Sequence, residues 1–177
     1  MPSKSSRVQR AMIELKAKVD DLATIRDKLI QYGVKHVGAF HQIDTYYKVP
    51  KGRLKLREIE GEKDAELIFY ERKNVAEPKK SSVFILTIPQ PQIFKQILKR
   101  IIKTKAVVDK MREICFYEDT QVHLDTVEGL GSFIEFERIT SGDPEQRKKD
   151  LLKLEKLREQ LNINYQQLEK LSYSDLI

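Results

Sequence analysis

Charged side chains recur two residues apart along several segments of this chain, and their types and spacing could do chemistry. Alternate residues of an extended strand point to the same face, so each group would give its strand one charged face. Lysine and arginine neutralise phosphate oxygens, whereas carboxylates hold Mg²⁺ or Mn²⁺ through oxygen. A triphosphate bound with its metal ion needs both kinds of side chain. The groups are Glu14, Lys16 and Lys18; Arg53, Lys55 and Arg57; Tyr70 and Arg72; Lys110 and Arg112; His123 and Asp125; and Glu135 and Glu137.

The segments that carry these groups are predicted to be strands. For any single strand, a polar face that simply meets water is the simpler explanation of the pattern. That explanation weakens as strands of the same kind accumulate along the chain. Alternation predicts about eight strands, at residues 12–19, 35–49, 53–57, 66–73, 82–88, 107–117, 121–125 and 132–139, with a polar loop at 74–81.

Three helices are predicted beside these strands. Apolar residues at helical spacing indicate one helix at residues 22–32, which Gly33 ends, and a second that begins near Pro91 and ends near residue 103. Asp143 and Pro144 predict the start of a third, and leucines at 151, 154, 157 and 161 continue it. Each helix has an apolar stripe that could cover one side of a sheet.

These elements favour an α+β fold, a closed eight-stranded antiparallel β-barrel with the helices packed outside and the charged faces around the lumen. Acids on some strands and bases on others would keep the lumen from holding unpaired charge of one sign. A length of 177 residues favours one domain at 11–177, preceded by a flexible tail at 1–10.

Composition narrows the function classes. The net charge is +6, yet 34% of residues are charged with the two signs nearly balanced, which points to an anionic ligand and makes nucleic-acid binding unlikely. Cys115 is the single cysteine, so no internal disulfide or zinc cluster is possible, and a cytoplasmic location is the default. No apolar run is long enough to cross a bilayer, and neither common glycine-rich phosphate motif occurs.

Taken in order, several short motifs identify a family resemblance. They are Ile13-Glu14-Leu15-Lys16-Ala17-Lys18, Gln42-Ile43-Asp44-Thr45-Tyr46-Tyr47, Gly52-Arg53-Leu54-Lys55-Leu56-Arg57-Glu58, Leu67-Ile68-Phe69-Tyr70-Glu71-Arg72, Lys80-x-Ser82, Val108-x-Lys110-x-Arg112, and His123-Leu124-Asp125 through Gly129-Leu130-Gly131 to Phe133-Ile134-Glu135-Phe136-Glu137. The chain resembles the CYTH superfamily, the triphosphate tunnel metalloenzymes, and most closely its class IV adenylyl cyclase-like branch, which is related to thiamine triphosphatase.

The resemblance implies roles for individual residues and a metal ion, Mg²⁺ or Mn²⁺. The implied metal ligands are Glu14, Asp125, Glu135 and Glu137. Lys16, Arg57 and Lys110 would be catalytic. The implied phosphate ligands are Lys16, Lys18, Lys55, Arg57, Arg72, Lys110 and Arg112. The partner would be a small molecule that contains a triphosphate, and the protein would be a monomer or homodimer.

One departure from the family pattern bears on function. The family motif opens with Glu-x-Glu-x-Lys, whereas this chain has Met12 at the first glutamate. Methionine does not ligate a hard cation such as Mg²⁺. Hydrolysis of the terminal phosphate of an inorganic or organic triphosphate is the leading expectation. The alternatives are an adenylyl cyclase that makes cyclic AMP and pyrophosphate, and a module that binds phosphorylated ligands without turnover.

Overall fold

The computed structural model describes residues 10–72, 79–141 and 143–177, and within these ranges the side chains of residues 10, 72, 79 and 80 are not described. The predicted tail at 1–10 therefore lies outside the description, apart from the backbone of residue 10. Most of the predicted polar loop at 74–81 also lies outside it.

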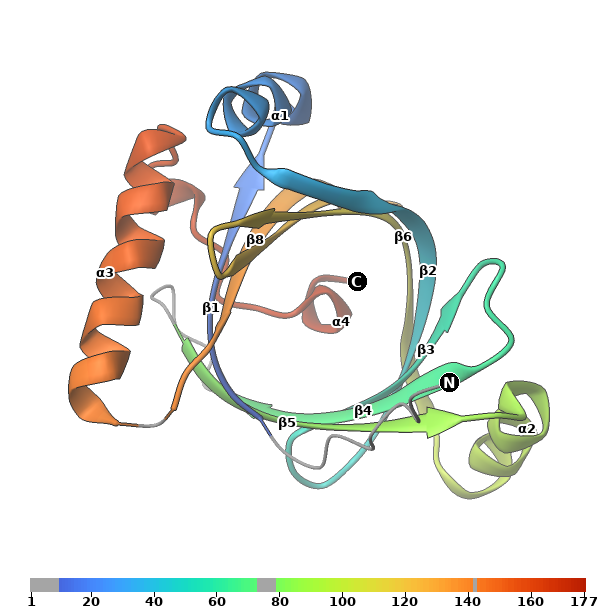
Figure 1. Ribbon diagram of the computed structural model, residues 1–177. Coiled ribbons are helices and arrows are strands. Elements are labelled where there is room, and N and C mark those ends of the chain that lie inside the picture. The colour runs from blue at the N-terminus through green and yellow to red at the C-terminus, as the bar shows by residue number, and fades with distance from the viewer. Residues whose placement is uncertain (1–9, 73–78, 142) are drawn as a thin grey trace, which may run out of the picture.

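The described strands close into one antiparallel barrel, as the sequence predicts, and their order around it is β1-β5-β4-β3-β2-β6-β7-β8 (Figure 1). With this order, β3 lies opposite β8 and β1 lies opposite β2, because four steps separate each pair around the barrel. The strands are β1 (Arg10–Val19), β2 (Lys35–Tyr47), β3 (Arg53–Ile59), β4 (Ala65–Arg72), β5 (Lys79–Ile88), β6 (Thr104–Tyr117), β7 (Thr120–Val127) and β8 (Gly131–Ile139).

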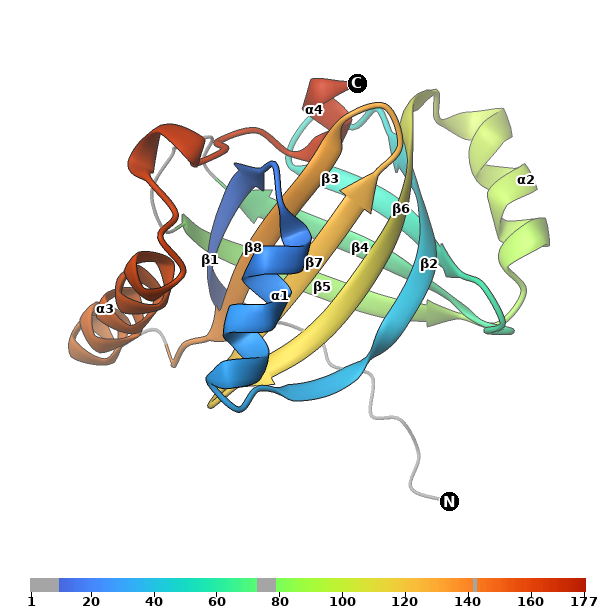
Figure 2. The same ribbon diagram turned by 90° about the horizontal axis from the view of Figure 1, so that it is seen from above.

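The three predicted helices lie outside the barrel (Figures 1 and 2), with Asp143 accepting a hydrogen bond from Gln146 N at the start of the third. A short fourth helix closes the chain and was not predicted. None of the described helices has the length and apolar character required to span a membrane. The helices are α1 (Leu22–Gln31), α2 (Pro91–Ile101), α3 (Pro144–Gln160) and α4 (Tyr173–Leu176), with a 3₁₀ turn at Tyr165–Gln167.

The apolar core lies between the barrel wall and these helices. Leu15 and Phe136 on the outer wall pack in one cluster with Leu29 of α1 and Leu154 of α3. A second cluster joins β3 and β5 to Leu98 of α2. Because alternate residues of a strand face opposite ways, covering the apolar faces from outside turns the charged faces inward.

Candidate functional site

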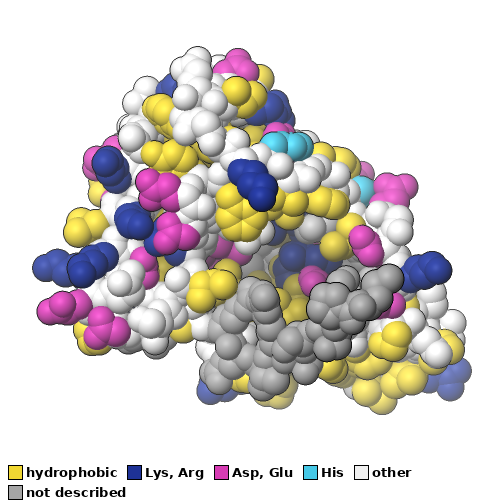
Figure 3. Space-filling view, viewed as in Figure 1, with side chains coloured by type: hydrophobic (Ala, Val, Ile, Leu, Met, Phe, Trp, Pro, Cys, Tyr) yellow, Lys and Arg dark blue, Asp and Glu magenta, His cyan; other side chains and the backbone are white. Residues whose placement is uncertain are grey.

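The interior of the barrel contains a cavity of about 230 Å³ whose walls differ in chemistry. Side chains from β2, β3 and β6 make a basic wall, those from β1, β7 and β8 make an acidic one, and β4 and β5 add Ile68, Val83 and Ile85 as an apolar wall. Figure 3 shows basic atoms within the hollow at the end of the barrel that faces the viewer. The cavity therefore offers phosphate-binding and cation-binding groups mostly on different strands, except that β1 carries both Glu14 and Lys16.

Asp44 organises the basic wall. Its carboxylate is fully buried, and it accepts hydrogen bonds from Lys55 Nζ at 2.8 Å, Lys110 Nζ at 2.7 Å and Arg57 Nε at 2.8 Å. Arg57 Nη2 adds a further bond of 3.0 Å, which makes its contact bidentate. One carboxylate thus holds three cations that come from β3 and β6, and their net charge stays positive.

Burial alone would raise the pKa of the Asp44 carboxyl, but the charges of Arg57, Lys55 and Lys110 hold it well below its ordinary value. The pKa of Lys110 falls to about 7, because burial and the nearby cations disfavour its charge more than Asp44 favours it. Lys110 therefore titrates near neutral pH in the empty cavity, and an incoming anion would favour its charged form.

Arg112 connects the basic wall to the acidic one. Its Nε donates to Asp125 Oδ1 at 2.7 Å, and its Nη2 donates to Asp125 Oδ2 at 2.5 Å and to Glu135 Oε2 at 2.7 Å. Tyr173 Oη also donates to Asp125 Oδ2, at 2.8 Å. Both oxygens of the buried Asp125 are thus engaged by protein groups, and they fix the guanidinium plane of Arg112.

The acidic wall consists of Glu14, Glu135 and Glu137, with His123 beside them. Register places Glu14 opposite Glu137 and His123 opposite Glu135 on neighbouring strands. Burial would raise the pKa of the Glu135 carboxyl, but the charges of Arg112 and Lys16 hold it well below its usual range. Ligand atoms of His123, Glu135 and Glu137 lie within 4.8 Å of one another, close enough to share one cation.

The C-terminal segment closes one end of the barrel (Figure 2), where α4 lies across the strands. Lys16 Nζ donates to Leu171 O and lies 4.2 Å from the centre of the Tyr173 ring, so the segment fixes this lysine at the cavity end. Asp175 anchors the segment to the rim, since it accepts from Arg53 Nη2 at 2.7 Å, from Ser172 Oγ at 2.9 Å and from Lys105 Nζ.

We expect Asp175→Asn to loosen this closure while leaving the barrel intact. Burial would raise the pKa of the Asp175 carboxyl, but its hydrogen bonds to Lys105, Arg53 and Ser172 lower it. The neutral amide of asparagine would lose the ion pairs with Lys105 and Arg53. Hydrogen bonds to charged groups contribute about 1.5–3 kcal/mol each. Amide hydrogen exchange over residues 171–177 should become at least tenfold faster, with exchange in β7 and β8 unchanged. Equal rates in the two proteins would show that other contacts hold the segment.

Most of the residues predicted from the sequence meet in the cavity, namely Glu14, Lys16, Lys55, Arg57, Lys110, Arg112, Glu135 and Glu137. Asp125 is close by but bound to Arg112. The side chain of Lys18 is exposed near the end closed by α4 and is not part of the enclosed wall. Arg72 ends β4, and its side chain lies outside the described part of the chain.

Sequence reasoning missed two residues that organise the site. Asp44 belongs to one of the motifs behind the family resemblance but has no predicted role, although Gln42, Asp44 and Tyr46 share the spacing of two that marks the other inward faces. Tyr173 lies in the terminal segment 172–176, which resembles the same branch of the family but has no spacing that would assign this tyrosine a role. Only the folded chain shows that its hydroxyl reaches Asp125.

A family model described as the CYTH domain matches residues 10–173, nearly the whole chain. The chain belongs to the CYTH domain family. The match and the closed eight-stranded antiparallel barrel confirm the family and fold predictions.

Individual relatives cover similar lengths. A Methanocaldococcus jannaschii protein named "Putative adenylate cyclase" is 27% identical over 173 residues, which is 93% of this chain and 97% of that protein. A solved Pyrococcus horikoshii structure superposes with a TM-score of 0.82 at 26% identity and covers 94% of this chain and 99% of its own. A Hippeastrum structure matches with a TM-score of 0.62 at 17% identity, over 94% and 93% of the two chains, and that likeness concerns the fold alone.

Proposed function

We propose that this CYTH protein is a metal-dependent triphosphatase that releases the terminal phosphate of a triphosphate. The observation that carries the proposal is the arrangement of opposite charges across the barrel. Lys55 and Arg57 on β3 lie opposite Glu135 and Glu137 on β8, in one cavity of about 230 Å³. A polyphosphate with its divalent ion has the matching distribution of charge.

The basic residues have distinct roles in this proposal. Water attacks the terminal phosphorus, the bond to the bridging oxygen breaks, and orthophosphate leaves with the shortened chain as the second product. Positioning and electrostatic stabilisation supply most of the catalysis in such a reaction. Lys16, Arg57 and Lys110 stabilise charge on the transferred group, while Lys55 and Arg112 bind the remaining phosphate oxygens.

The carboxylates of Glu14, Glu135 and Glu137 fit Mg²⁺ or Mn²⁺, since both ions prefer oxygen donors. When bound, the ion would neutralise charge on the phosphate oxygens. Asp125 is implied as a further ligand by the family resemblance, but its oxygens are bonded to Arg112 and Tyr173. We therefore propose that Asp125 positions Arg112.

Turnover of inorganic triphosphate, ATP and thiamine triphosphate with Mg²⁺ or Mn²⁺ tests the proposal, with orthophosphate, pyrophosphate and cyclic nucleotide resolved separately. The expected result is metal-dependent orthophosphate release that EDTA abolishes and added metal restores. Binding of triphosphate without any product would instead make the protein a binding module, the alternative that Met12 raised.

Adenylyl cyclase activity is the second candidate, because the Methanocaldococcus jannaschii relative carries that name. The Hippeastrum protein is described as a "putative adenylyl cyclase" with a dominant triphosphatase activity. Cyclisation requires a purine and a ribose held for in-line attack, and pockets that enclose a ligand of that size usually span about 300–1,000 Å³. The cavity is smaller. Cyclic AMP and pyrophosphate from ATP in the assay above would promote this candidate.

The affinity for inorganic triphosphate should depend on pH through Lys110. The pKa of Lys110 is about 7 in the empty protein, so below pH 7 this lysine is already protonated when triphosphate binds. Above pH 7 Lys110 is mostly neutral and must take up a proton as triphosphate binds. Dissociation constants should therefore rise by up to tenfold for each pH unit between pH 7 and pH 9. Titration calorimetry with inorganic triphosphate measures this slope.

Lys110→Arg provides the control, because a guanidinium stays charged throughout this range. In this variant the dissociation constant for triphosphate should rise much less between pH 7 and pH 9. An equal slope in both proteins would assign the pH dependence to another group or to the ligand.

A further inference from the structure

We infer that His123 is a ligand of the metal ion in this cavity, so that one imidazole nitrogen joins the carboxylates of Glu135 and Glu137. The inference deepens the proposed function and rests on it for the presence of the ion. It assigns a mixed nitrogen–oxygen site instead of a site made of carboxylates alone.

The environment of His123 is the observation behind this inference. The residue is only 3% exposed, and its Nδ1 has no hydrogen-bond partner among the described residues. Nδ1 lies 3.7 Å from Glu135 Oε2 and 3.8 Å from Glu137 Oε1. Both distances exceed those of hydrogen bonds, and a buried polar atom without a partner is costly.

A shared cation explains these distances better than a proton does. A protonated imidazole that donated to one carboxylate would approach it to about 2.7–3.2 Å. Instead Nδ1 lies nearly the same distance from the two oxygens, outside hydrogen-bonding range of each. Register fixes this arrangement, because His123 pairs directly with Glu135 across β7 and β8. The backbone therefore holds the three donors around a common space.

The nitrogen donor changes which ions the site should prefer. Imidazole favours later first-row transition metals, whereas Mg²⁺ is best held by oxygen. Met12 lines the same cavity, and its thioether is a poor donor for Mg²⁺. We therefore expect Mn²⁺, and more strongly Co²⁺, to bind more tightly than Mg²⁺, and His123→Gln to reduce this preference.

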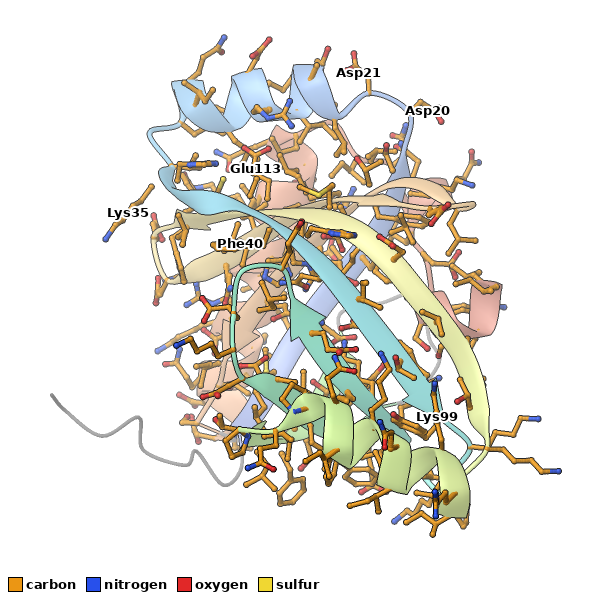
Figure 4. All side chains as sticks on the ribbon, turned by 90° about the vertical axis from the view of Figure 1, so that its right-hand side faces the viewer. Asp20, Asp21, Lys35, Phe40, Lys99 and Glu113 are labelled. Atoms are coloured by element: carbon orange, nitrogen blue, oxygen red, sulfur yellow. The ribbon has the colours of Figure 1, made fainter. Side chains whose placement is uncertain are left out.

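A second group of donors must be separated from this one in any experiment. His36, Glu113 and Cys115 also have ligand atoms within 4.8 Å of one another, on the outside of the barrel wall. Figure 4 shows Glu113 below α1. Arg26 of α1 contacts Glu113 at 2.8 Å, and the Cys115 thiol is buried with a raised pKa, so this group is less suited to a cation.

The chain contains three histidines, which allows an experiment that leaves the cavity unchanged. The untagged double variant His36→Gln, His41→Gln retains His123 alone. His41 lies outside the cavity, where it contacts Glu60 and Asp109, and is therefore a suitable second site to remove. Pulsed electron paramagnetic resonance of bound Mn²⁺, with ¹⁴N-histidine or ¹⁵N-histidine incorporated, reports a directly coordinated imidazole.

The expected result is nitrogen coupling in the double variant that changes on ¹⁵N labelling and is lost in a His123→Gln protein that still binds Mn²⁺. If Mn²⁺ binding requires Glu135 and Glu137 but the bound ion shows no nitrogen coupling, the inference is overturned and the proposed function stands. Coupling that disappears with His36→Gln would also overturn it. Failure to bind Mn²⁺ even with inorganic triphosphate present would overturn both.

Discussion

Asp44→Asn should destabilise the empty protein by about 3–5 kcal/mol, because removing one partner of a buried ion pair leaves the other charge uncompensated. Here the loss affects Lys55, Arg57 and Lys110 together, each of which donates to this carboxylate. Urea denaturation with and without the substitution measures the effect. The loss of stability should be larger at pH 6 than at pH 8. At pH 8 Lys110 is mostly neutral, which relieves part of the repulsion among the cations of the basic wall.

Inorganic triphosphate should partly restore the stability of this variant. The anion would supply the negative charge that the cations lack, so its binding should raise the melting temperature more in Asp44→Asn than in the unchanged protein. Asp27→Asn on the exposed side of α1 is the matched control and should change stability by less than about 0.5 kcal/mol. If triphosphate raised the melting temperature equally in the unchanged protein, Asp44→Asn and Asp27→Asn, the basic wall would not be where triphosphate binds.

If Asp44→Asn does not fold alone, refolding with inorganic triphosphate present becomes the measurement. Recovery of native circular dichroism only in its presence would support the same conclusion. Sodium sulfate at equal ionic strength is the control for general salt effects. Recovery in sulfate alone would contradict a specific role for the polyphosphate.

The barrel could be predicted from the sequence because its strands alternate cleanly. In β1, Ile13, Leu15 and Ala17 are buried in the outer core, while Glu14 and Lys16 face the cavity. A shift of one residue would exchange these faces, so the pattern alone fixes which side chains point inward. The start of β6 was predicted three residues late, because Thr104 and Lys105 carry no apolar alternation and the strand is extended by the pairing of Thr104 with Tyr47 of β2.

The pairing of charges inside the barrel could not be predicted in the same way. That Arg112 faces Asp125 depends on the register between β6 and β7, and that register follows from the turn between them. The three cations on Asp44 come from two strands, β3 and β6, and Asp44 itself lies on β2 between them, an order around the barrel that does not follow the sequence. Local patterns reveal which face a residue occupies, but long-range pairing determines its partner.

Replacing both Glu135 and Glu137 with glutamine should reduce kcat/KM for the triphosphate by about 10³-fold, since loss of a catalytic ion removes several kcal/mol of charge stabilisation. Glutamine keeps the shape of each side chain but offers no charged oxygen to Mg²⁺ or Mn²⁺. Arg112 keeps its hydrogen bonds to both carboxylate oxygens of Asp125, so the barrel should remain folded. Phosphate release under saturating metal, with urea stability measured alongside, tests the prediction.

The single variants should differ, because the two carboxylates have different neighbours. Glu135 also accepts a hydrogen bond from Arg112 at 2.7 Å, so Glu135→Gln weakens the hold on Arg112 as well as on the ion. Glu137→Gln should affect the ion alone, and higher metal concentration should restore more of its activity. Glu62→Gln, in an exposed turn, is the matched control and should leave turnover unchanged. Full activity in the double variant would place the catalytic ion elsewhere and contradict the proposed mechanism.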